Sequence, residues 1–326
     1  MRQRTYLVAG ATGKQGGALA RQLLARGRRV RVYTRDPGGT DARLLQRLGA
    51  ELHAGGFDDP GPLARAMRGC DGAFVMTTFA ESGAGAEIRQ GHALADAAWT
   101  AALPHLVVGS IAGADRRTGV PHLEAKREAE QHLARAGVPY TILAPVFFME
   151  NWLAIVPAAL RRGRFAYPLP HDHVLQMVAL DDLAAFARMV LELREEFLNR
   201  RIEIAGDALP MEAVARILAS AAGRELPYHA VPLEAVWARD LALGQLCSWL
   251  VREGTHVDVD RLRAHHRDLG WTSLAAWARR QDWAALLAAP AGEVPLETPR
   301  VWTPPAPGTL ARSWRPRPDP GTVALP

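Results

Sequence analysis

Apolar and polar positions alternate along the first half of the chain in a pattern typical of an α/β protein. Short, nearly continuous apolar runs are separated by longer segments in which apolar residues recur with helical spacing. Such runs indicate strands buried on both faces, so the pattern predicts a parallel, doubly wound sheet of the Rossmann type. The predicted strands are Thr5–Ala9, Arg29–Thr34, Ala50–Ala54, Gly72–Thr77, His105–Gly109 and Tyr140–Ala144. The predicted helices lie near residues 14–26, 41–48, 60–68, 84–102 and 122–136.

The pattern becomes less regular after the sixth predicted strand. One well-started helix follows Asp181 or Asp182, either of which could cap it. A further strand is expected over Arg201–Ala205 and a further helix over Met211–Ala222. The stretch from residue 228 to 287 is rich in tryptophan at helical spacing, which indicates core or lid packing more often than a cofactor site.

These patterns predict three parts of the chain. We expect residues 1–150 to form a nucleotide-binding Rossmann core. Residues 151–290 would form a smaller C-terminal α/β lobe, which is interleaved with the core sheet and forms a cleft with it. Residues 291–326 contain nine prolines and hardly any apolar periodicity, which predicts a disordered or extended tail.

Composition narrows the class of protein. The 326 residues are 48% hydrophobic and 22% charged, which is enough for one large core or two unequal lobes. We expect no signal peptide, no membrane span and no direct nucleic-acid binding, because no apolar stretch is long enough and the net charge of +5 includes no basic block. Cys70 and Cys247 lack disulfide or metal spacing, which predicts no metal site and favours a reducing cytoplasm.

A glycine-rich loop follows the first predicted strand. The sequence VAGATGKQGG places Gly10, Gly13 and Gly16 directly between a strand and a helix. In dinucleotide-binding folds one glycine makes the turn, one lets the backbone approach the pyrophosphate, and one lets the helix pack on the strand. The pyrophosphate then lies at the helix N-terminus, which favours an anion. The loop therefore predicts a dinucleotide site, and the alternative is a tight turn that binds nothing.

The residues after the second predicted strand bear on the choice of cofactor. An acidic side chain there binds the ribose diol of NAD, whereas a cation accommodates the 2′-phosphate of NADP. In VYTRDP, Arg35 is the first polar side chain beyond Thr34, and Asp36 follows it. This order favours NADP(H) over NAD(H). The alternative is that Arg35 is a solvated loop residue and that Asp36 binds the ribose.

Several spaced motifs together resemble one family. GATGKQGG, TRDP, GGFDDP, HLEAK and APVFFMENW occur in an order similar to that of NmrA-like proteins of the HSCARG type, an atypical branch of the short-chain dehydrogenases/reductases. The resemblance covers about residues 5–287. It implies a Rossmann domain with a smaller C-terminal lobe and NADP(H) bound across the cleft. Members of the family act as redox-sensing regulators that bind protein partners, or as NADPH-dependent reductases of quinones and similar acceptors.

The resemblance also implies roles for individual residues. The segment from Phe148 to Asn151 would close over the nicotinamide, and Lys126 would hold the nicotinamide ribose. Gly56 stands where the family usually has an Asp near the adenine, which leaves that contact to the backbone or Phe57. His92 stands where relatives often carry Lys, which weakens any phosphate contact there. The other implied cofactor contacts are Gly10, Ala11, Thr12, Gly13, Lys14, Gln15 and Gly16 at the pyrophosphate, Arg35 at the 2′-phosphate, and Thr77, Thr78 and Phe79 beside the ribose.

The stretch HLEAK has a histidine and a lysine where many nicotinamide-dependent reductases carry Tyr-x-x-x-Lys. Residues four apart share a helix face, so His122 and Lys126 can point to the same cleft as catalytic candidates. A nearby ammonium lowers the pKa of the imidazole, which leaves a weak acid whose ring N–H can still polarise a carbonyl. Ser110 is a candidate second hydroxyl or a turn residue. The alternative for His122 is an ordinary helix-start residue, and Glu130 is expected on a solvated face.

Two functions follow from these features. The first is an NADP(H)-binding regulator with weak or no dehydrogenase activity, which senses the redox state and binds a protein partner. The second is an NADPH-dependent reductase of a quinone or another small carbonyl substrate that binds between the lobes. The intact glycine loop disfavours a nucleotide-free structural module. Either protein would be a monomer or a homodimer.

Overall fold

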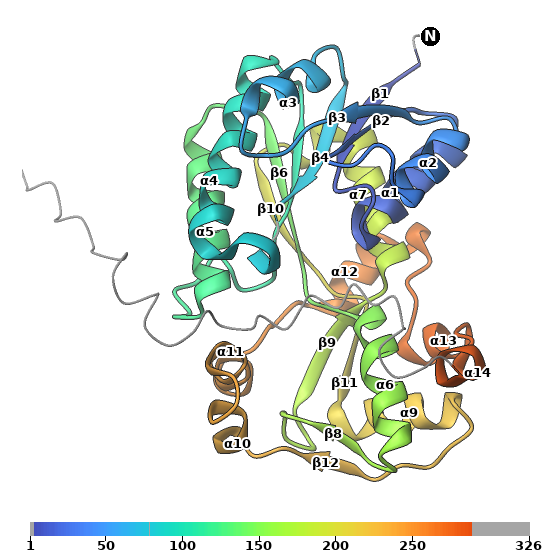
Figure 1. Ribbon diagram of the computed structural model, residues 1–326. Coiled ribbons are helices and arrows are strands. Elements are labelled where there is room, and N and C mark those ends of the chain that lie inside the picture. Colours follow the sequence, from blue (N-terminus) through green and yellow to red (C-terminus); the bar gives the residue numbers. More distant parts are fainter. Residues whose placement is uncertain (1–2, 78, 289–326) are drawn as a thin grey trace, which may run out of the picture.

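Seven parallel strands form the main sheet of the computed structural model, which describes residues 3–77 and 79–288 apart from the side chains of residues 79–82 (Figure 1). Their spatial order is β10-β6-β5-β4-β1-β2-β3. The strands are β1 (Thr5–Ala9), β2 (Arg29–Thr34), β3 (Glu51–Ala54), β4 (Gly72–Met76), β5 (Leu106–Gly109), β6 (Tyr140–Pro145) and β10 (Arg200–Ile204). The predicted α/β class with a doubly wound parallel sheet is confirmed, and the proline-rich segment 291–326 lies outside the described residues.

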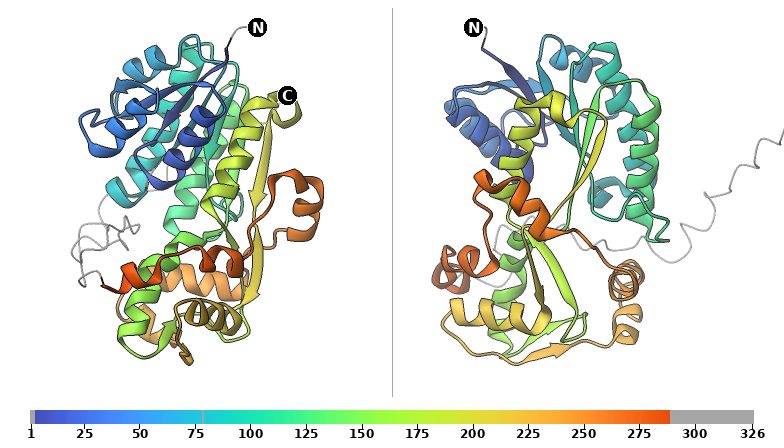
Figure 2. Two further views of the ribbon diagram at one scale, coloured as in Figure 1. Left: turned by 90° about the vertical axis from the view of Figure 1, so that its right-hand side faces the viewer. Right: turned by 180° about the vertical axis from the view of Figure 1, so that it is seen from behind.

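Helices cover both faces of this sheet (Figure 1; Figure 2). The helices of one face are α1 (Lys14–Ala25), α2 (Thr40–Arg47) and α7 (Leu180–Glu192). Those of the other face are α3 (Pro60–Met67), α4 (Phe79–Thr100) and α5 (Pro121–Arg135). Gly83, with φ of 74°, interrupts α4 near its beginning. With both faces covered by helices, a ligand of such a sheet is expected at its carboxyl edge.

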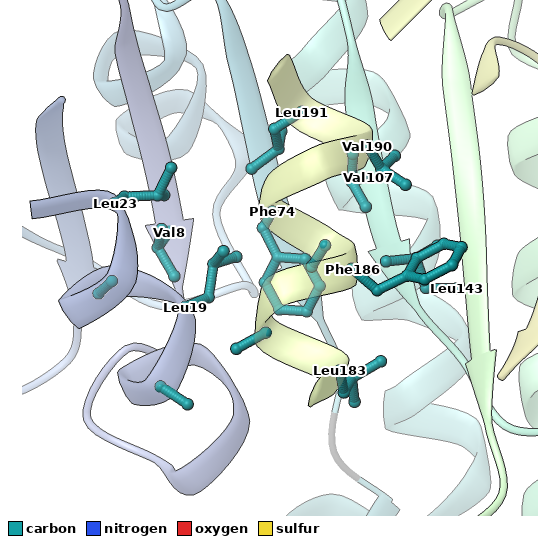
Figure 3. Packing of buried hydrophobic residues seen from close by; sticks show 14 of the residues in the cluster. Val8, Leu19, Leu23, Phe74, Val107, Leu143, Leu183, Phe186, Val190 and Leu191 are labelled. Carbon is teal, nitrogen blue, oxygen red and sulfur yellow. The ribbon is translucent and has the colours of Figure 1, made fainter. Parts of the chain in front are cut away.

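The alternation of side chains along each strand explains why the strands read as continuous apolar runs. In β1, Val8 belongs with Leu19 of α1 and Phe186 of α7 to the core cluster on one face of the sheet (Figure 3). Leu7 belongs to the cluster on the opposite face. Consecutive side chains of a strand point to opposite faces, so a sheet that is covered twice needs apolar residues at every position. Phe74 of β4 fills the centre of the first face and is fully buried.

The smaller lobe lies below the carboxyl edge of the main sheet in Figure 1. Its core contains Trp152, Phe165, Met177 and Trp277. Its strands are β7 (Phe147–Phe148), β9 (Val174–Val178) and β11 (Asp207–Pro210) in one sheet and β8 (Phe165–Tyr167) and β12 (Tyr228–Ala230) in another. Its helices are α6 (Trp152–Arg161), α9 (Met211–Ala221), α10 (Leu233–Trp237), α11 (Leu241–Arg252), α13 (Leu274–Arg279) and α14 (Trp283–Ala288). The remaining helices are η1 (Met149–Asn151), α8 (Arg194–Phe197), α12 (Val259–His265) and η2 (Arg267–Leu269).

One predicted helix start is wrong. Helix α7 has Ala179 at its N-cap, and neither of the two aspartates that follow caps it. Instead, the buried carboxylate of Asp182 accepts hydrogen bonds from the backbone N–H of Thr272 at 2.7 Å and from its hydroxyl at 2.9 Å. Asp182 therefore ties α7 to the C-terminal segment, a long-range contact that the local sequence does not reveal. No helix within the described ranges is long and apolar enough to span a membrane.

Candidate active site

The carboxyl ends of β1 and β4 meet where the strand order reverses. The chain proceeds from β1 to β2 and β3 on one side, and β4, β5 and β6 lie on the other. In an open α/β sheet, this switch point is where the crevice for a ligand forms. The glycine loop follows β1 there, and Thr77 follows β4. The fold therefore brings two of the predicted cofactor segments to one edge of the sheet.

The glycine loop is shaped by close backbone approaches. Gly10 has φ of 71°, a conformation that side chains disfavour. A Cβ on Gly16 would lie 2.5 Å from the carbonyl oxygen of Gly10, so only glycine lets α1 begin this close to β1. Helix α1 starts after Gly13 without a side-chain cap and without an acidic residue in its first turn. Space and uncapped N–H groups at a helix N-terminus fit a bound pyrophosphate.

Gln15 adds a buried polar atom beside this loop. Its side chain is 7% exposed, and its amide nitrogen has no hydrogen-bond partner among the described residues. The nitrogen lies at the end of β5, because a Cβ built on Gly109 would be 3.6 Å from it. A buried donor without a partner costs free energy unless a ligand or water completes it. This orphaned donor also fits a polar ligand in the crevice.

Arg35 and Asp36 follow β2 at the surface, and both are exposed. The carboxylate of Asp36 accepts a hydrogen bond from the backbone N–H of Gly38 at 3.0 Å and so closes its own turn. Arg35 passes beside Gly56, since a Cβ built on Gly56 would lie 3.8 Å from Cγ of Arg35. Arg35 and Gly56, the position at which the family usually has an Asp, are therefore neighbours.

Tyr33 fixes the loop on which Phe57 lies. Its hydroxyl donates a hydrogen bond to the carbonyl oxygen of Gly56 at 2.9 Å. A Cβ on Gly55 would lie 2.1 Å from the same hydroxyl, so a side chain at this position would displace the loop. The ring of Phe57 lies 6.2 Å from that of Tyr33, centre to centre. The loop that would meet an adenine is thus held by a buried tyrosine of β2.

A buried ion pair lies directly behind the end of β4. Nζ of Lys126 lies 2.8 Å from Oε1 of Glu87 and donates hydrogen bonds to the carbonyl oxygen and the hydroxyl of Thr77, both at 2.9 Å. The hydroxyl of Thr77 donates in turn to Oε1 of Glu87 at 2.9 Å. Glu87 is 0% exposed. These contacts join β4, α4 and α5 at the crevice.

His122 lies one helical turn before Lys126 on α5 and is partly buried. Burial lowers the pKa of its imidazole; Lys126 lowers this pKa further, whereas Glu87 acts in the opposite direction. The ring is therefore neutral at pH 7 and can donate only through a ring N–H. His122, Lys126 and Glu87 thus interact electrostatically with one another. His122 and Lys126 were predicted from the sequence as site residues, and Glu87 was not.

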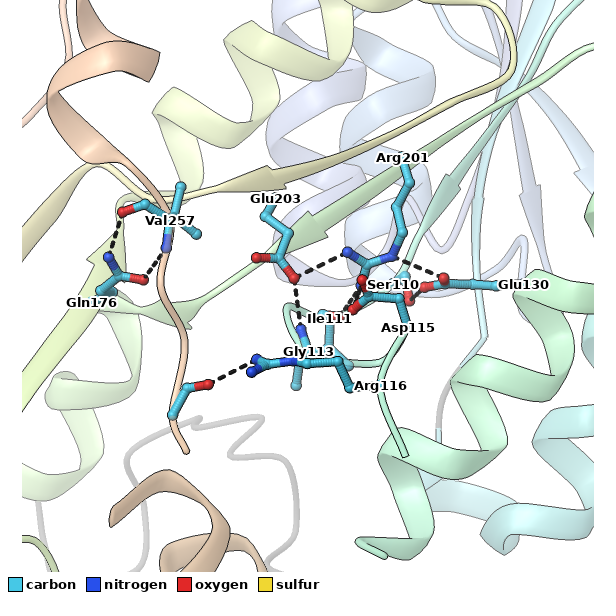
Figure 4. Close-up of polar contacts among 11 residues, drawn as sticks. Ser110, Ile111, Gly113, Asp115, Arg116, Glu130, Gln176, Arg201, Glu203 and Val257 are labelled. Carbon is cyan, nitrogen blue, oxygen red and sulfur yellow. Dashed lines mark hydrogen bonds and ion pairs between the residues drawn. The ribbon is translucent and has the colours of Figure 1, made fainter. Parts of the chain in front are cut away.

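Ser110 belongs to a second polar cluster, centred on Arg201 of β10 (Figure 4). Its hydroxyl donates a hydrogen bond to the carboxylate of Glu130, which also pairs with Arg201 at 2.9 Å. Arg201 further pairs with Glu203 at 3.0 Å and with Asp115 at 3.4 Å. Glu130 is 8% exposed, and burial raises the pKa of its carboxyl group. The prediction that Glu130 lies on a solvated face is wrong, because β10 brings a cation to it from a distant part of the chain.

The two polar clusters border one small cavity. It has a volume of about 20 Å³, enough for about one water molecule, and is lined by Thr77, Ser110, Lys126 and Glu130 together with apolar side chains. Ser110 and Lys126 therefore face the same small cavity, whereas His122, which was predicted to share a cleft with Lys126, is not among its lining residues. Thr78 and the side chain of Phe79, two of the predicted ribose contacts, lie outside the described residues and side chains.

The segment from Phe148 to Asn151 connects the main sheet to the smaller lobe. Phe148 pairs with Val178 of β9 and packs against the core cluster of α1 and α7. Glu150 accepts hydrogen bonds from the backbone N–H of Leu180 at 3.1 Å and from the indole of Trp277 at 3.0 Å. Burial raises the pKa of Glu150. This segment is thereby fixed to the start of α7 and to α13.

Sequence reasoning missed Glu87, Glu130 and Arg201. In the sequence, Glu87 is one acidic residue within a helix rich in alanine and glycine. Gly91 lies one turn later on the same face of the helix and packs directly against Ala129 of α5. A Cβ at position 91 would lie 2.6 Å from the Cβ of Ala129, so only glycine fits there. Small residues at helical spacing signal a closely packed helix pair, and this signal could have placed Glu87 against α5. No group of three metal-ligating side chains occurs within the described ranges.

Comparison with known proteins identifies a matching family and relatives of similar sequence. A model of the NmrA-like family matches residues 2–262. The NAD(P)H azoreductase of Xenophilus azovorans is 31% identical over 229 residues, which cover 70% of this chain and 77% of that protein. Quinone oxidoreductase 2 of Escherichia coli (strain K12) is 26% identical over 225 residues, which cover 68% of this chain and 76% of that protein.

Two solved structures share the fold. The NADPH-dependent quinone oxidoreductase of Escherichia coli, complexed with NADPH, has a TM-score of 0.71 at 23% identity and covers 84% of this chain and 98% of its own. NmrA, a negative transcriptional regulator in complex with NADP, has a TM-score of 0.70 at 20% identity and covers 87% of this chain and 100% of its own. At these identities, the likeness shows a common Rossmann-type fold.

Proposed function

Because the chain belongs to the NmrA-like family, we propose that it binds NADP(H) in the crevice between β1 and β4 and reduces a small, electron-poor acceptor of the quinone or azo type. The resemblance read from the motifs is thereby confirmed at the level of the family. The proposal draws its acceptor class from the azoreductase and the quinone oxidoreductase, whose names state these activities.

The residues of the crevice fit the cofactor. The loop from Gly10 to Gly16 would hold the pyrophosphate, Arg35 the 2′-phosphate, and Thr77 the neighbouring ribose. The close approach at Gly16 and the orphaned amide of Gln15 support this assignment. The segment from Phe148 to Asn151 would cover the nicotinamide. When bound, NADPH supplies a hydride to the acceptor.

One observation supports an acceptor of the quinone type: the site has a neutral histidine where a tyrosine acid would lie. Burial lowers the pKa of His122, so the ring donates a hydrogen bond but is a poor proton source. A quinone that accepts a hydride forms a resonance-stabilised phenolate, which can take its proton from solvent, whereas a simple ketone forms a strongly basic alkoxide that needs a proton donor beside it. His122 would therefore orient the acceptor and polarise it through its ring N–H.

A panel of acceptors tests this proposal. We expect NADPH to be oxidised in the presence of benzoquinone or an azo dye and not in the presence of a simple aliphatic ketone. Rapid reduction of the ketone would contradict the role given to His122. Absence of NADPH binding would contradict the assignment of the crevice.

One observation favours a second candidate, an NADP(H)-binding regulator with a protein partner. The hydroxyl of Ser110 is bound to Glu130, and the ammonium of Lys126 is bound to Thr77 and Glu87, so two of the three catalytic candidates direct their donors into the protein. Tight NADPH binding without turnover of any acceptor in the panel would select this candidate.

A further inference from the structure

The ammonium of Lys126 is already engaged by two hydrogen bonds and one ion pair. Nζ lies 2.9 Å from the carbonyl oxygen of Thr77, 2.9 Å from its hydroxyl oxygen and 2.8 Å from Oε1 of Glu87. A lysine ammonium carries three N–H donors. Two of the three donors are therefore used and the charge is paired, so a ribose hydroxyl would have to compete with these contacts.

Glu87 makes the ion pair costly to break. Its carboxylate is 0% exposed, and Lys126 is the one cation that pairs with it among the described residues. A carboxylate buried without a counter-ion is strongly destabilising. If Lys126 turned toward a ligand, Glu87 would keep only the hydroxyl of Thr77 as a donor. The other carboxylate oxygen, Oε2, has no hydrogen-bond partner within the described ranges.

The space beside Lys126 leads to the same conclusion. The cavity that Lys126 shares with Ser110 and Glu130 has a volume of about 20 Å³, so no ligand larger than a water molecule fits on that side of the ammonium. The contacts of the ammonium all lead to the end of β4 and to α4, the two elements that border the crevice.

We infer that Lys126 is the buried counter-ion of Glu87 and a positioning residue, which keeps the end of β4 in place for the cofactor without binding the ribose itself. The inference rests on the proposed function only where it concerns the cofactor. The ion pair and its effect on stability do not depend on that function.

A double-mutant cycle separates the two roles of Lys126. The variants are Lys126→Met, Glu87→Leu and the two combined, with apolar side chains of similar volume. We measure the melting temperature without nucleotide and the dissociation constant of NADPH by fluorescence titration. Each single variant should melt roughly 10 °C lower than the parent protein, because it leaves one buried charge uncompensated. The double variant should melt within a few degrees of the parent, because the uncompensated charge is gone.

The dissociation constants of NADPH for the single and the double variants distinguish a positioning residue from a ribose ligand. Lys126→Met alone should weaken binding roughly tenfold or more, since the uncompensated Glu87 displaces the end of β4. The double variant should bind NADPH within roughly threefold of the parent, since Lys126 makes no contact with the cofactor. If the double variant regains its melting temperature but binds NADPH as poorly as Lys126→Met, Lys126 is a ribose ligand and the inference is wrong.

A control variant and the solubility of the variants complete the test. Glu124→Gln removes the partly exposed pair between Glu124 and Arg127 on the same helix and should leave NADPH binding unchanged. If a single variant is insoluble, a soluble double variant supports the counter-ion role and an insoluble one overturns it. If the parent does not bind NADPH, the proposed function fails, but the melting temperatures still test the ion pair. A double variant whose loss of melting temperature equals the sum of the two single losses would overturn the ion-pair role.

Discussion

Gly16 passes so close to Gly10 that a Cβ on Gly16 would lie 2.5 Å from the carbonyl oxygen of Gly10. Real Cβ atoms do not approach a backbone oxygen this closely, so α1 and the end of β1 can keep their positions only if residue 16 is glycine. The approach fixes the loop that the proposed function assigns to the pyrophosphate. Packing of the strand and the helix and the cofactor site therefore depend on the same contact.

Gly16→Ala should lower the free energy of unfolding by about 3 kcal/mol, because the neighbour it meets is backbone and cannot rotate away. It should also weaken NADPH binding, because the loop must open. Gly85→Ala is the matched control, since Gly85 lies in α4 with only the end of the Arg89 side chain nearby, at 3.7 Å from a Cβ. Chemical denaturation should show a small gain for the control. Equal stability of Gly16→Ala and the parent would contradict the close approach.

Arg35→Ala should remove most of the preference for NADPH over NADH. The exposed side chain of Arg35 passes beside Gly56 with its methylene groups, whereas the carboxylate of Asp36 is engaged by the N–H of Gly38. A charge-assisted contact with the 2′-phosphate is worth roughly 1.5–3 kcal/mol. Titration of parent and variant with both nucleotides measures the difference, with the exposed Arg43→Ala as a control. If the parent binds NADH as tightly as NADPH, Arg35 has no such role.

His122→Ala should lower quinone reduction roughly tenfold, the worth of one neutral hydrogen bond, and leave the dissociation constant of NADPH within a few-fold. His122→Tyr rebuilds Tyr-x-x-x-Lys on α5 and should add slow reduction of simple ketones. Steady-state kinetics of the three proteins give the comparison. Unchanged quinone reduction in His122→Ala would show that the ring takes no part in the reaction.

Stability should fall as the pH decreases from about 6.5 toward 4, in part because of His105. Burial lowers its pKa to about 4. Its Nε2 donates to the hydroxyl of Thr141, whose own proton goes to the carbonyl oxygen of Phe197, and Nδ1 has no partner among the described residues. The unfolded chain binds a proton at this histidine that the folded protein does not, so acid favours unfolding, by up to about 3 kcal/mol. Denaturation of His105→Gln at pH 7 and pH 4 should show a smaller loss than that of the parent; an equal loss would contradict the assigned cause.

Local patterns in the sequence were sufficient to predict the main sheet. The strands Thr5–Ala9 and Arg29–Thr34 have the predicted bounds: the first is an apolar run that is followed by a glycine, and the second alternates arginine with valine before Tyr33 and is followed by Arg35. The short strands of the smaller lobe were not predicted. Phe147–Phe148 has two residues, too few for a periodic pattern, and it depends on pairing with β9.

The candidate site also contains parts that the sequence predicts and parts that it does not. The glycine loop and the pair His122 and Lys126 are local motifs, so their positions could be predicted from the spacing of the residues. The partners of these motifs are not local. Glu87 reaches Lys126 from α4, and Arg201 reaches Glu130 from β10, 71 positions along the chain. Such partners depend on how the helices pack on the sheet, and no spacing within one segment reveals them.

Oxidation of NADPH by benzoquinone is the most direct test of the central claim, that this crevice binds NADP(H) and reduces an electron-poor acceptor. We expect steady-state turnover in the parent protein, faster with NADPH than with NADH, and a large loss of turnover in Gly16→Ala at a temperature where that variant is folded. Tight binding of NADPH with no oxidation by benzoquinone or an azo dye would contradict the reductase and leave the regulator.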